Sequence, residues 1–310
     1  MKISDILTLA KKQNKILEAE LLLGFLLNQN RVFVFANHGL EIDENIYKKF
    51  QKLWLKISDN YPLAYITKLK EFYGREFYVD ERVLIPRPET ECLVEEVMKA
   101  MGCQLLAVSQ KVKVIDIGAG SGCIGISVAL ELMEKFGIKK ENLKVILSDI
   151  SREALEVAKI NVDKFGLKDI TKIREGDLLS PVMTVCSSVI PAEAGILDPY
   201  ERKDSCENRN DMKILVANLP YIGSKKYNFV QNGVKKHEPG LALFSGDDGL
   251  DSYRKLFEQI KCSKIKFNLM AYEFGDSQKE AFEALIKVNL SECQFSFYKD
   301  LAGLWRGVIA

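Results

Sequence analysis

The sequence predicts an α/β protein in which a small helical domain precedes a larger domain built around a parallel β-sheet. The chain has 310 residues, and because a typical domain has ~100 to 200 residues we expect two domains. Apolar residues recur at helical spacing through the first part of the chain. After Pro88, runs typical of strands alternate with runs typical of helices, which is the pattern of βα units around a parallel sheet.

The N-terminal segment is expected to form several short packed helices that end near Leu55. Between Tyr61 and Ile85, aromatic and β-branched residues surround a glycine, which predicts a hairpin that links two domains. We therefore assign residues 1–80 to a helical domain with its connecting hairpin, and residues 81–310 to the larger domain.

The larger domain is expected to alternate strands and helices. Ser151 follows a predicted strand and precedes an apolar helical pattern, so it is the expected N-cap of a helix. The last two strands are expected to form a hairpin. Strands are predicted at residues 113–117, 143–148, 170–174, 213–217, 265–273, 292–298 and 304–309, and helices at 121–136, 151–165 and 276–288.

Residues 184–212 interrupt this alternation. The segment has two prolines, clustered polar residues and no clear period, so it is predicted to be an inserted surface loop. Its VIPAEAGI core resembles peptides encoded by mobile palindromic repeats, which implies an insertion that the fold tolerates.

The composition is that of an ordinary globular protein, with 47% hydrophobic and 28% charged residues. The 44 basic and 43 acidic residues nearly cancel, so no net charge attracts the whole molecule to nucleic acid or to a membrane surface. The seven scattered cysteines lack a CxxC pair, which indicates neither disulfides nor a zinc site. The longest apolar run, Leu21–Leu27, is far shorter than the ~20 residues of a membrane span, and the N-terminus lacks a long apolar signal segment. We expect a cytoplasmic protein without a bound metal.

A glycine-rich loop, Asp116–Gly122, follows the first predicted strand of the sheet and opens a helix. Glycines allow a sharp turn and bring backbone N–H groups against a ligand. Gly120–Gly125 also matches the GxGxxG pattern of nicotinamide enzymes, so the loop alone does not identify the cofactor. A turn that only packs a strand against a helix is the remaining alternative.

Acidic residues follow the next two predicted strands. Asp149 ends one of them, where a carboxylate can accept hydrogen bonds from both ribose hydroxyls of an adenosine. An acid favoured by the dipole of the following helix is the simpler alternative. Asp177 and Leu178 end the third βα unit and, taken alone, indicate an ordinary turn.

Asn218-Leu-Pro-Tyr221 follows a strongly apolar predicted strand and is the most informative motif. The lone pair of an amide or exocyclic amine nitrogen is delocalised, so two acceptors must hold its N–H groups. The side chain of Asn218 and the carbonyl of Leu219 can be those acceptors, Pro220 favours an extended backbone before it, and the ring of Tyr221 can stack on a flat substrate. Catalysis would then consist mainly of positioning.

The chemistry expected of this motif requires no strong general base when the methyl donor is a sulfonium, which is already a good leaving group. None is evident in the sequence. The two histidines, His38 and His237, are expected to be structural or exposed.

Taken together, these motifs resemble those of the release-factor glutamine methyltransferase family (HemK/PrmC) over nearly the whole chain. The resemblance implies a seven-stranded Rossmann-like class I methyltransferase sheet and an N-terminal domain that engages release factors. It also implies methyl transfer from S-adenosylmethionine to the N5 amide of the glutamine in a Gly-Gly-Gln loop. We expect the protein to be a monomer. The residues that carry it are Pro62-Leu-Ala-Tyr65-Ile66, Glu71-Phe-Tyr-Gly74, Leu84-Ile-Pro86-Arg87-Pro88-Glu89-Thr90-Glu91, Asp116–Gly122, Asn218–Tyr221, Glu238-Pro239 and Gly246-Asp-Asp-Gly249-Leu250.

The resemblance also implies roles for single residues. Asn218, Leu219, Pro220 and Tyr221 would hold the glutamine amide. Arg87 and Glu89 would border the pocket. The S-adenosylmethionine site would comprise Gly118, Ala119, Gly120, Ser121, Gly122, Asp149, Leu178 and Asn218.

One position departs from the family pattern, because Leu219 replaces the first proline of Asn-Pro-Pro-Tyr. The resulting motif resembles the Asn-Leu-Pro-Tyr of rRNA adenine dimethyltransferases, although the backbone carbonyl is retained. The leading alternative is therefore an N6-adenine methyltransferase that acts on a flipped base of DNA or RNA, which the near-neutral charge and the lack of a basic arm disfavour. A nicotinamide oxidoreductase would leave the motif without a role. A degenerate, non-enzymatic module that only docks on release factors is the fourth hypothesis.

Overall fold

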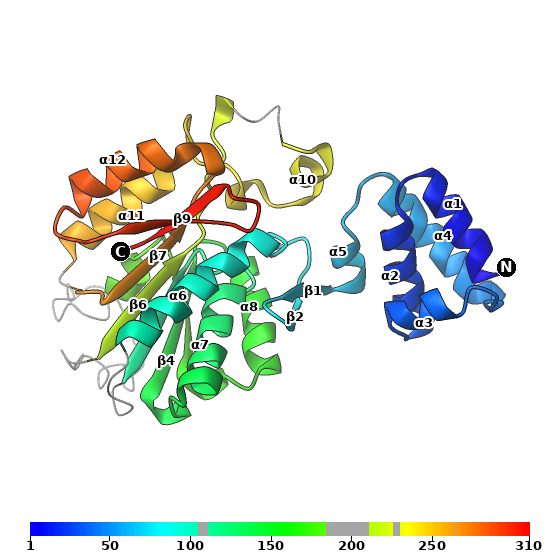
Figure 1. Cartoon of the computed structure of the whole chain (residues 1–310), viewed down its shortest axis with the longest axis horizontal. Helices are drawn as coiled ribbons and strands as arrows, with labels where there is room; N and C mark the ends of the chain where they lie inside the picture. Colours follow the sequence, from blue (N-terminus) through cyan, green and yellow to red (C-terminus); the bar gives the residue numbers. More distant parts are fainter. Residues whose placement is uncertain (105–110, 184–210, 226–229, 264) are drawn as a thin grey trace, which may run out of the picture.

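The structure is a computed structural model that describes residues 1–104, 111–183, 211–225, 230–263 and 265–310 (Figure 1). A group of helices lies at one end of the molecule, the sheet and its covering helices lie at the other, and a two-stranded hairpin lies between them. All but the last two residues of the expected insertion at 184–212 lie outside the described residues.

The N-terminal helices pack around their own apolar core, to which Leu22, Leu23 and Phe50 contribute. Asn30 and Asp43 cap two of the helices through side-chain oxygens that accept backbone N–H groups. The helices are α1 (Ile3–Lys12), α2 (Ile16–Leu27), α3 (Arg31–Ala36), α4 (Glu44–Ser58) and α5 (Leu63–Thr67).

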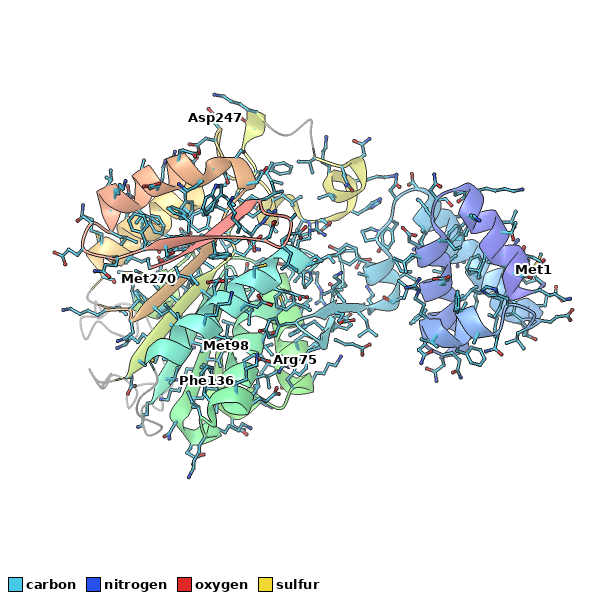
Figure 2. The ribbon with its side chains drawn as sticks, viewed as in Figure 1. Met1, Arg75, Met98, Phe136, Asp247 and Met270 are labelled. Carbon is cyan, nitrogen blue, oxygen red and sulfur yellow. The ribbon has the colours of Figure 1, made fainter. Side chains whose placement is uncertain are left out.

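The antiparallel hairpin of β1 (Leu69–Phe72) and β2 (Arg75–Tyr78) follows, as predicted. Its Phe77 is fully buried in the core of the larger sheet. Arg75, labelled in Figure 2, forms ion pairs of 2.8 and 2.7 Å with Glu131 and Glu134 of the helix beside it. The hairpin is thus anchored to the sheet domain.

The larger sheet has seven strands in the order β5-β4-β3-β6-β7-β9-β8, which confirms the expected fold. The first five in this order are parallel, and β9 is antiparallel to both β7 and β8. The strands are β3 (Val112–Ile117), β4 (Leu143–Asp149), β5 (Thr171–Glu175), β6 (Met212–Ala217), β7 (Leu269–Glu273), β8 (Ser296–Lys299) and β9 (Trp305–Ile309).

Helices cover both faces of this sheet (Figure 1). Successive strand residues point to opposite faces, so Val114 enters one core with α6, α7 and α8, whereas Ile115 enters the other with α9, α11 and α12. Every residue of β6 is buried, as in a central parallel strand. The helices of this domain are α6 (Glu91–Gln104), α7 (Cys123–Phe136), α8 (Arg152–Lys164), α9 (Ser180–Met183), α10 (Asn232–His237), α11 (Asp251–Cys262) and α12 (Lys279–Asn289), with 3₁₀ helices at Pro88–Thr90, Lys140–Asn142, Lys168–Ile170, Gly240–Ala242 and Asp276–Gln278.

Several element boundaries differ from the sequence-based predictions. The strand expected at 292–298 is β8 at Ser296–Lys299, and the helix expected from residue 276 begins at Lys279 after a 3₁₀ turn. The strand expected from residue 265 begins at Leu269, because the side chain of Asn268 accepts the Lys213 N–H and takes the place of a ladder bond there. The helix expected from residue 121 begins at Cys123, because Gly122 has a φ of +78° and still belongs to the loop. Among the described helices, none is long and apolar enough to cross a membrane.

Candidate active site

The parallel strands end at one edge of the sheet, and the predicted site residues lie along that edge. The register aligns Ile117 with Ser148 on one side and with Ala217 on the other, so β3, β4 and β6 end at the same level. Ligands of open α/β sheets bind at such an edge. The edge carries the Gly118–Gly122 loop after β3, Asp149 at the end of β4, Leu178 after β5, Asn218–Tyr221 after β6 and Glu273 at the end of β7.

The glycine loop is held by backbone hydrogen bonds to the neighbouring strand. The N–H groups of Gly118 and Ala119 both donate to the carbonyl of Ser148, at 2.8 and 3.0 Å. Gly120 has a φ of +53°, and a Cβ built there would meet no atom within 4 Å. The loop therefore exposes its backbone to open space, where a ligand can approach closely.

Two further polar contacts fix the far end of this loop. Ser121 is buried, and its carbonyl accepts a 2.9 Å hydrogen bond from the side chain of Asn161. The same amide also donates to the carbonyl of Tyr78 in the hairpin, at 3.0 Å. Asn161, which the sequence reasoning missed, thus links the hairpin to the loop.

Asp116 lies below the loop and is fully buried. Its Oδ2 accepts the N–H of Gly125 at 2.8 Å, and its Oδ1 has no hydrogen-bond partner among the described residues. Burial raises the pKa of Asp116 to about 7, an effect that the Gly125 hydrogen bond opposes and the charge of Asp149 reinforces.

Asp149 uses both carboxylate oxygens inside the protein. Oδ2 accepts the N–H of Gly120 and Oδ1 accepts the N–H of Ser151, each at 2.9 Å. Burial raises its pKa and these hydrogen bonds oppose the shift. Each oxygen keeps a free lone pair, so the geometry remains suited to ribose hydroxyls.

Leu178 has a left-handed backbone with a φ of +54°. Its carbonyl accepts a 3.1 Å hydrogen bond from the hydroxyl of Ser148, and the next N–H donates to Gln259 at 2.7 Å. These contacts hold Leu178 beside β4, on the same edge as Asp149.

The Asn218–Tyr221 motif presents two free acceptors. The side-chain N–H₂ of Asn218 donates to the hydroxyl of Thr90 at 3.0 Å. The N–H of Leu219 donates to the hydroxyl of Tyr253 at 3.1 Å. Within the described part of the chain, neither Asn218 Oδ1 nor the Leu219 carbonyl accepts a hydrogen bond. Both oxygens are therefore available to accept hydrogen bonds from an N–H₂ group.

The side chains of Tyr253 and Gln278 fix the backbone of this motif and of the neighbouring strand ends through hydrogen bonds. The hydroxyl of Tyr253 contacts the carbonyls of Ala217 and Glu273 and so joins the ends of β6 and β7. The carbonyl of Tyr221 accepts a 2.8 Å hydrogen bond from the side chain of Gln278. A Cβ at Gly249 would lie 2.0 Å from that carbonyl, so glycine is required there. Pro220 lies partly exposed between these fixed peptides.

Glu273 is a charged residue at the end of β7 that the sequence reasoning missed. It is 1% exposed, and the hydroxyl of Tyr221 donates to its Oε1 at 3.4 Å. Burial raises its pKa to about 7, while the Thr90 hydroxyl, the Arg306 charge and the Tyr221 hydroxyl oppose the shift. An acidic residue that ends an apolar strand, as Asp149 also does, is the signal that could have identified it.

Arg87 and Glu89, which were expected to border the pocket, occupy different environments. Arg87 forms a 2.7 Å ion pair with Glu238, whose other oxygen accepts the N–H of Ile85 at 3.1 Å. Glu89 is exposed, and its charge raises the pKa of Glu273. Thr90, between Glu89 and α6, is the residue of this segment that contacts the Asn218 side chain.

The sheet order, with its antiparallel β7-β9-β8 edge and a glycine loop after β3, defines an S-adenosylmethionine-dependent methyltransferase of the class I fold. Residues 108–184 match a methyltransferase domain model, and residues 2–67 match the PrmC N-terminal domain. A crystal structure of the N-terminal domain of human METTL16 has a TM-score of 0.50 and 15% identity, covering 80% of this chain and 78% of that chain, which supports the fold alone.

Curated relatives are similar over nearly the full length. The release factor glutamine methyltransferase of Clostridium acetobutylicum is 33% identical over 293 residues, covering 94% of this chain and 90% of its own. The Bacillus cereus protein of the same name is 33% identical over 291 residues, again covering 94% and 90%. The chain belongs to the release factor glutamine methyltransferase family.

Proposed function

We propose that this enzyme transfers a methyl group from S-adenosylmethionine to the N5 side-chain amide of the glutamine in the Gly-Gly-Gln motif of peptide chain release factors. It would act as a cytoplasmic monomer, without a stably bound nucleic acid or a metal. The observation that carries the proposal is the pair of free acceptors at Asn218 Oδ1 and the Leu219 carbonyl, beside the Tyr221 ring. Near full-length similarity to enzymes named for this reaction supports it.

The acceptor pair matches the chemistry of a primary amide. Its two N–H groups would donate to Asn218 Oδ1 and to the Leu219 carbonyl, which leaves the nitrogen lone pair directed at the methyl donor. The Tyr221 ring would stack on the flat amide. Because the donor carries a good leaving group, this positioning supplies most of the rate enhancement.

The cofactor site would lie along the neighbouring strand ends. The backbone of Gly118, Ala119, Gly120, Ser121 and Gly122 would cradle the amino-acid part, Asp149 would accept the ribose hydroxyls, Leu178 would contact the adenine, and Asn218 would border the sulfonium. The open space over Gly120 and the free lone pairs of Asp149 fit this assignment. When bound, S-adenosylmethionine supplies the methyl group on a positively charged sulfur.

Residues outside the acceptor pair would contribute to substrate recognition. Residues 1–80 would form the release-factor-recognition domain and residues 81–310 the methyltransferase domain. Arg87 and Glu89 would border the glutamine pocket, with Arg87 held in place by Glu238.

A second candidate substrate is the exocyclic amine of adenine, because Leu219 gives the motif an Asn-Leu-Pro-Tyr sequence and the same two acceptors could hold that amine. The balance of 44 basic and 43 acidic residues disfavours a nucleic-acid substrate.

The decisive assay incubates the enzyme and labelled S-adenosylmethionine with a purified release factor, or with an RNA and a DNA duplex. We expect label on the release factor, and none when its Gly-Gly-Gln glutamine is changed to alanine. Asn218→Ala should lower the rate by about 100-fold or more, the order expected for removing one preorganised polar partner of a reaction. Asn142→Ala, the same change at the opposite edge of the sheet, is the matched control. Label on nucleic acid would instead establish the adenine alternative.

A further inference from the structure

The side chain of Gln278 connects three segments that meet beside the Asn218–Tyr221 motif. Its Nε2 donates to the carbonyl of Tyr221 at 2.8 Å and to the carbonyl of Asp248 at 2.7 Å. Its Oε1 accepts the N–H of Gly275 at 2.8 Å. One amide thus joins the end of the motif, the loop that contains Asp248 and the turn that follows β7.

Only an amide can make this set of hydrogen bonds. The three partners are backbone groups, so it is fixed which of them donate and which accept. Two carbonyls require a side chain with two N–H donors, and one N–H requires an acceptor on the same side chain. An ionised carboxylate offers acceptors alone, and a thioether offers a weak acceptor alone. The same partners fix the orientation of the Gln278 amide, because exchanging Oε1 and Nε2 would break all three bonds.

The backbone packs closely around the Gln278 amide. Gln278 is 7% exposed, so water has little access to it. A Cβ at Gly249 would lie 2.0 Å from the Tyr221 carbonyl oxygen and 2.6 Å from Gln278 Nε2. A Cβ at Gly275 would lie 2.9 Å from Gln278 Oε1. Two glycine backbones therefore pack directly against these hydrogen bonds, and a bond lost in such a site is costly because no solvent replaces it.

The ring of Tyr221 is supported by the same arrangement. A Cβ at Gly275 would lie 3.4 Å from Tyr221 Cδ2, so the Gly275 backbone lies beside the ring. The ring hydroxyl donates to Glu273 Oε1 at 3.4 Å. Because Gln278 holds both the Tyr221 carbonyl and the Gly275 N–H, it fixes the ring and the backbone beside it together.

The two acceptors of the motif are held by other residues. Thr90 accepts a hydrogen bond from the Asn218 side chain at 3.0 Å, and Tyr253 accepts the Leu219 N–H at 3.1 Å. A shift of the Tyr221 peptide would therefore move the ring while the acceptors stay in place.

We propose that Gln278 is a positioning residue that holds the Tyr221 ring in a fixed position relative to Asn218 Oδ1 and the Leu219 carbonyl. The proposal rests on the proposed function, because that function assigns the stacking role to Tyr221. Gln278 acts through Tyr221 and not on the substrate or the methyl donor. It fixes the surface on which the planar amide of the substrate lies.

Two variants of similar length separate the hydrogen bonds of Gln278. Gln278→Glu, when ionised, keeps an acceptor for Gly275 but has no donor for either carbonyl, and Gln278→Met keeps the volume without these bonds. Both should lower kcat for a release factor by about 10- to 100-fold, because a displacement of about 1 Å near the reacting groups has an effect of that order. Gln294→Glu, the same change at an exposed position before β8, is the matched control and should keep the wild-type rate.

Binding and stability measurements distinguish positioning from a general loss of structure. The affinity for S-adenosylhomocysteine should be unchanged in all three variants, because its proposed site lies at the ends of β3 and β4. Thermal unfolding identifies a temperature at which the variants are folded, and rates are compared there. A Gln278→Glu enzyme as fast as the wild type would overturn the proposal, since the bonds to the two carbonyls would then be dispensable. A loss of rate explained entirely by weaker S-adenosylhomocysteine binding would overturn it as well.

A measurement without turnover separates this proposal from the proposed function. Fluorine NMR of enzyme labelled with 3-fluorotyrosine gives a signal for Tyr221, assigned by its loss in Tyr221→Phe. The signal should shift or broaden in Gln278→Glu and Gln278→Met and stay unchanged in Gln294→Glu. If the wild type methylates nucleic acid and not release factors, the proposed function is wrong, and this signal still decides whether Gln278 positions the ring. An unchanged signal in both Gln278 variants would contradict the positioning role.

The wild-type enzyme provides a test that does not depend on the folding of any variant. The side-chain N–H₂ group of Gln278 is buried and bonded to two carbonyls, so its protons should exchange with D₂O at least about tenfold more slowly than those of the exposed Gln294. Equal exchange rates would show that these bonds do not persist, and the proposal would then be wrong.

Discussion

Asp149 Oδ2 accepts the N–H of Gly120 at 2.9 Å, which joins the end of β4 to the glycine loop after β3. One carboxylate thus shapes the loop and retains lone pairs for a ligand. This double role separates Asp149 from an acid that merely begins a helix, although Oδ1 also accepts the N–H of Ser151. The proposed cofactor site should consequently be sensitive to this residue in two ways.

We expect Asp149→Ala to weaken the binding of S-adenosylhomocysteine by at least about tenfold, because both a ribose partner and the support of the loop are lost. Asp149→Asn keeps an acceptor and should lose less. Isothermal titration calorimetry measures both affinities, with Asp163→Asn at an exposed position of α8 as the control. Equal affinity for the wild type and Asp149→Ala would contradict the assignment.

Gly125 packs where no side chain fits. A Cβ there would lie 2.8 Å from Leu147 Cδ2 and 2.9 Å from Asp116 Cβ. We expect Gly125→Ala to lower the free energy of unfolding by about 1–3 kcal/mol through overpacking. Gly102→Ala is the matched control, because its Cβ would meet only Phe136 at 4.0 Å, an ordinary contact. Urea unfolding should show a neutral or slightly stabilising effect for the control. A similar change in both variants would argue against this packing constraint.

The buried carboxyl of Asp116 should make stability fall as pH rises. Burial raises its pKa to about 7, so the native state retains a proton that the unfolded chain has lost. The stabilisation is full below the ordinary pKa near 4 and is lost as pH rises through 7. Asp116→Asn should remove about 2 kcal/mol of the change in unfolding free energy between pH 5 and 7.5.

Urea unfolding at those two pH values, without cofactor, measures the effect of Asp116. The window avoids Asp80 and Asp248, whose lowered pKa values of about 2 affect stability only at lower pH. Desolvation of Glu273, whose pKa is also raised to about 7, adds a pH dependence of the same sign that both proteins retain. The same slope in the wild type and in Asp116→Asn would show that Asp116 is ionised throughout.

The Arg87–Glu238 pair should contribute more to stability than a surface ion pair. The side chain of Glu238 is 2% exposed, so Arg87→Ala leaves a buried carboxylate without its partner. We expect a loss of about 1–3 kcal/mol in the free energy of unfolding, and a smaller loss for Glu238→Gln, which can still accept the Ile85 N–H.

The exposed pair between Lys236 and Asp59 is the matched control for this comparison, with side chains 56% and 70% exposed. Lys236→Ala should change stability by less than about 1 kcal/mol. Thermal or urea unfolding of the single and double variants gives the coupling energy of each pair. A coupling for Arg87 and Glu238 no larger than that of the control would contradict the expectation.

The sequence by itself determined the fold and the chemical nature of the site. Periodicity predicted the alternation of strands and helices, because side-chain spacing follows directly from backbone geometry. The Asn218–Tyr221 motif and the glycine loop are contiguous in sequence, so their residue types indicated the chemistry before their positions in space were known. The ends of elements were less predictable, as at Leu269 and Cys123, because single hydrogen bonds and backbone angles decide them.

Only the tertiary structure decided which distant residues support the motif. Thr90 is 128 positions from Asn218 in the sequence, yet the two side chains form a direct hydrogen bond. Tyr253 is 34 positions from Leu219, and its hydroxyl accepts the Leu219 N–H. Glu273 lies beside the Asn218–Tyr221 motif because β7 pairs with β6 in the sheet. Such contacts depend on strand order and on the packing of helices against the sheet, which no local sequence pattern records. The sequence therefore determined which residue types the candidate site contains, and the packing of the sheet determined how they are oriented.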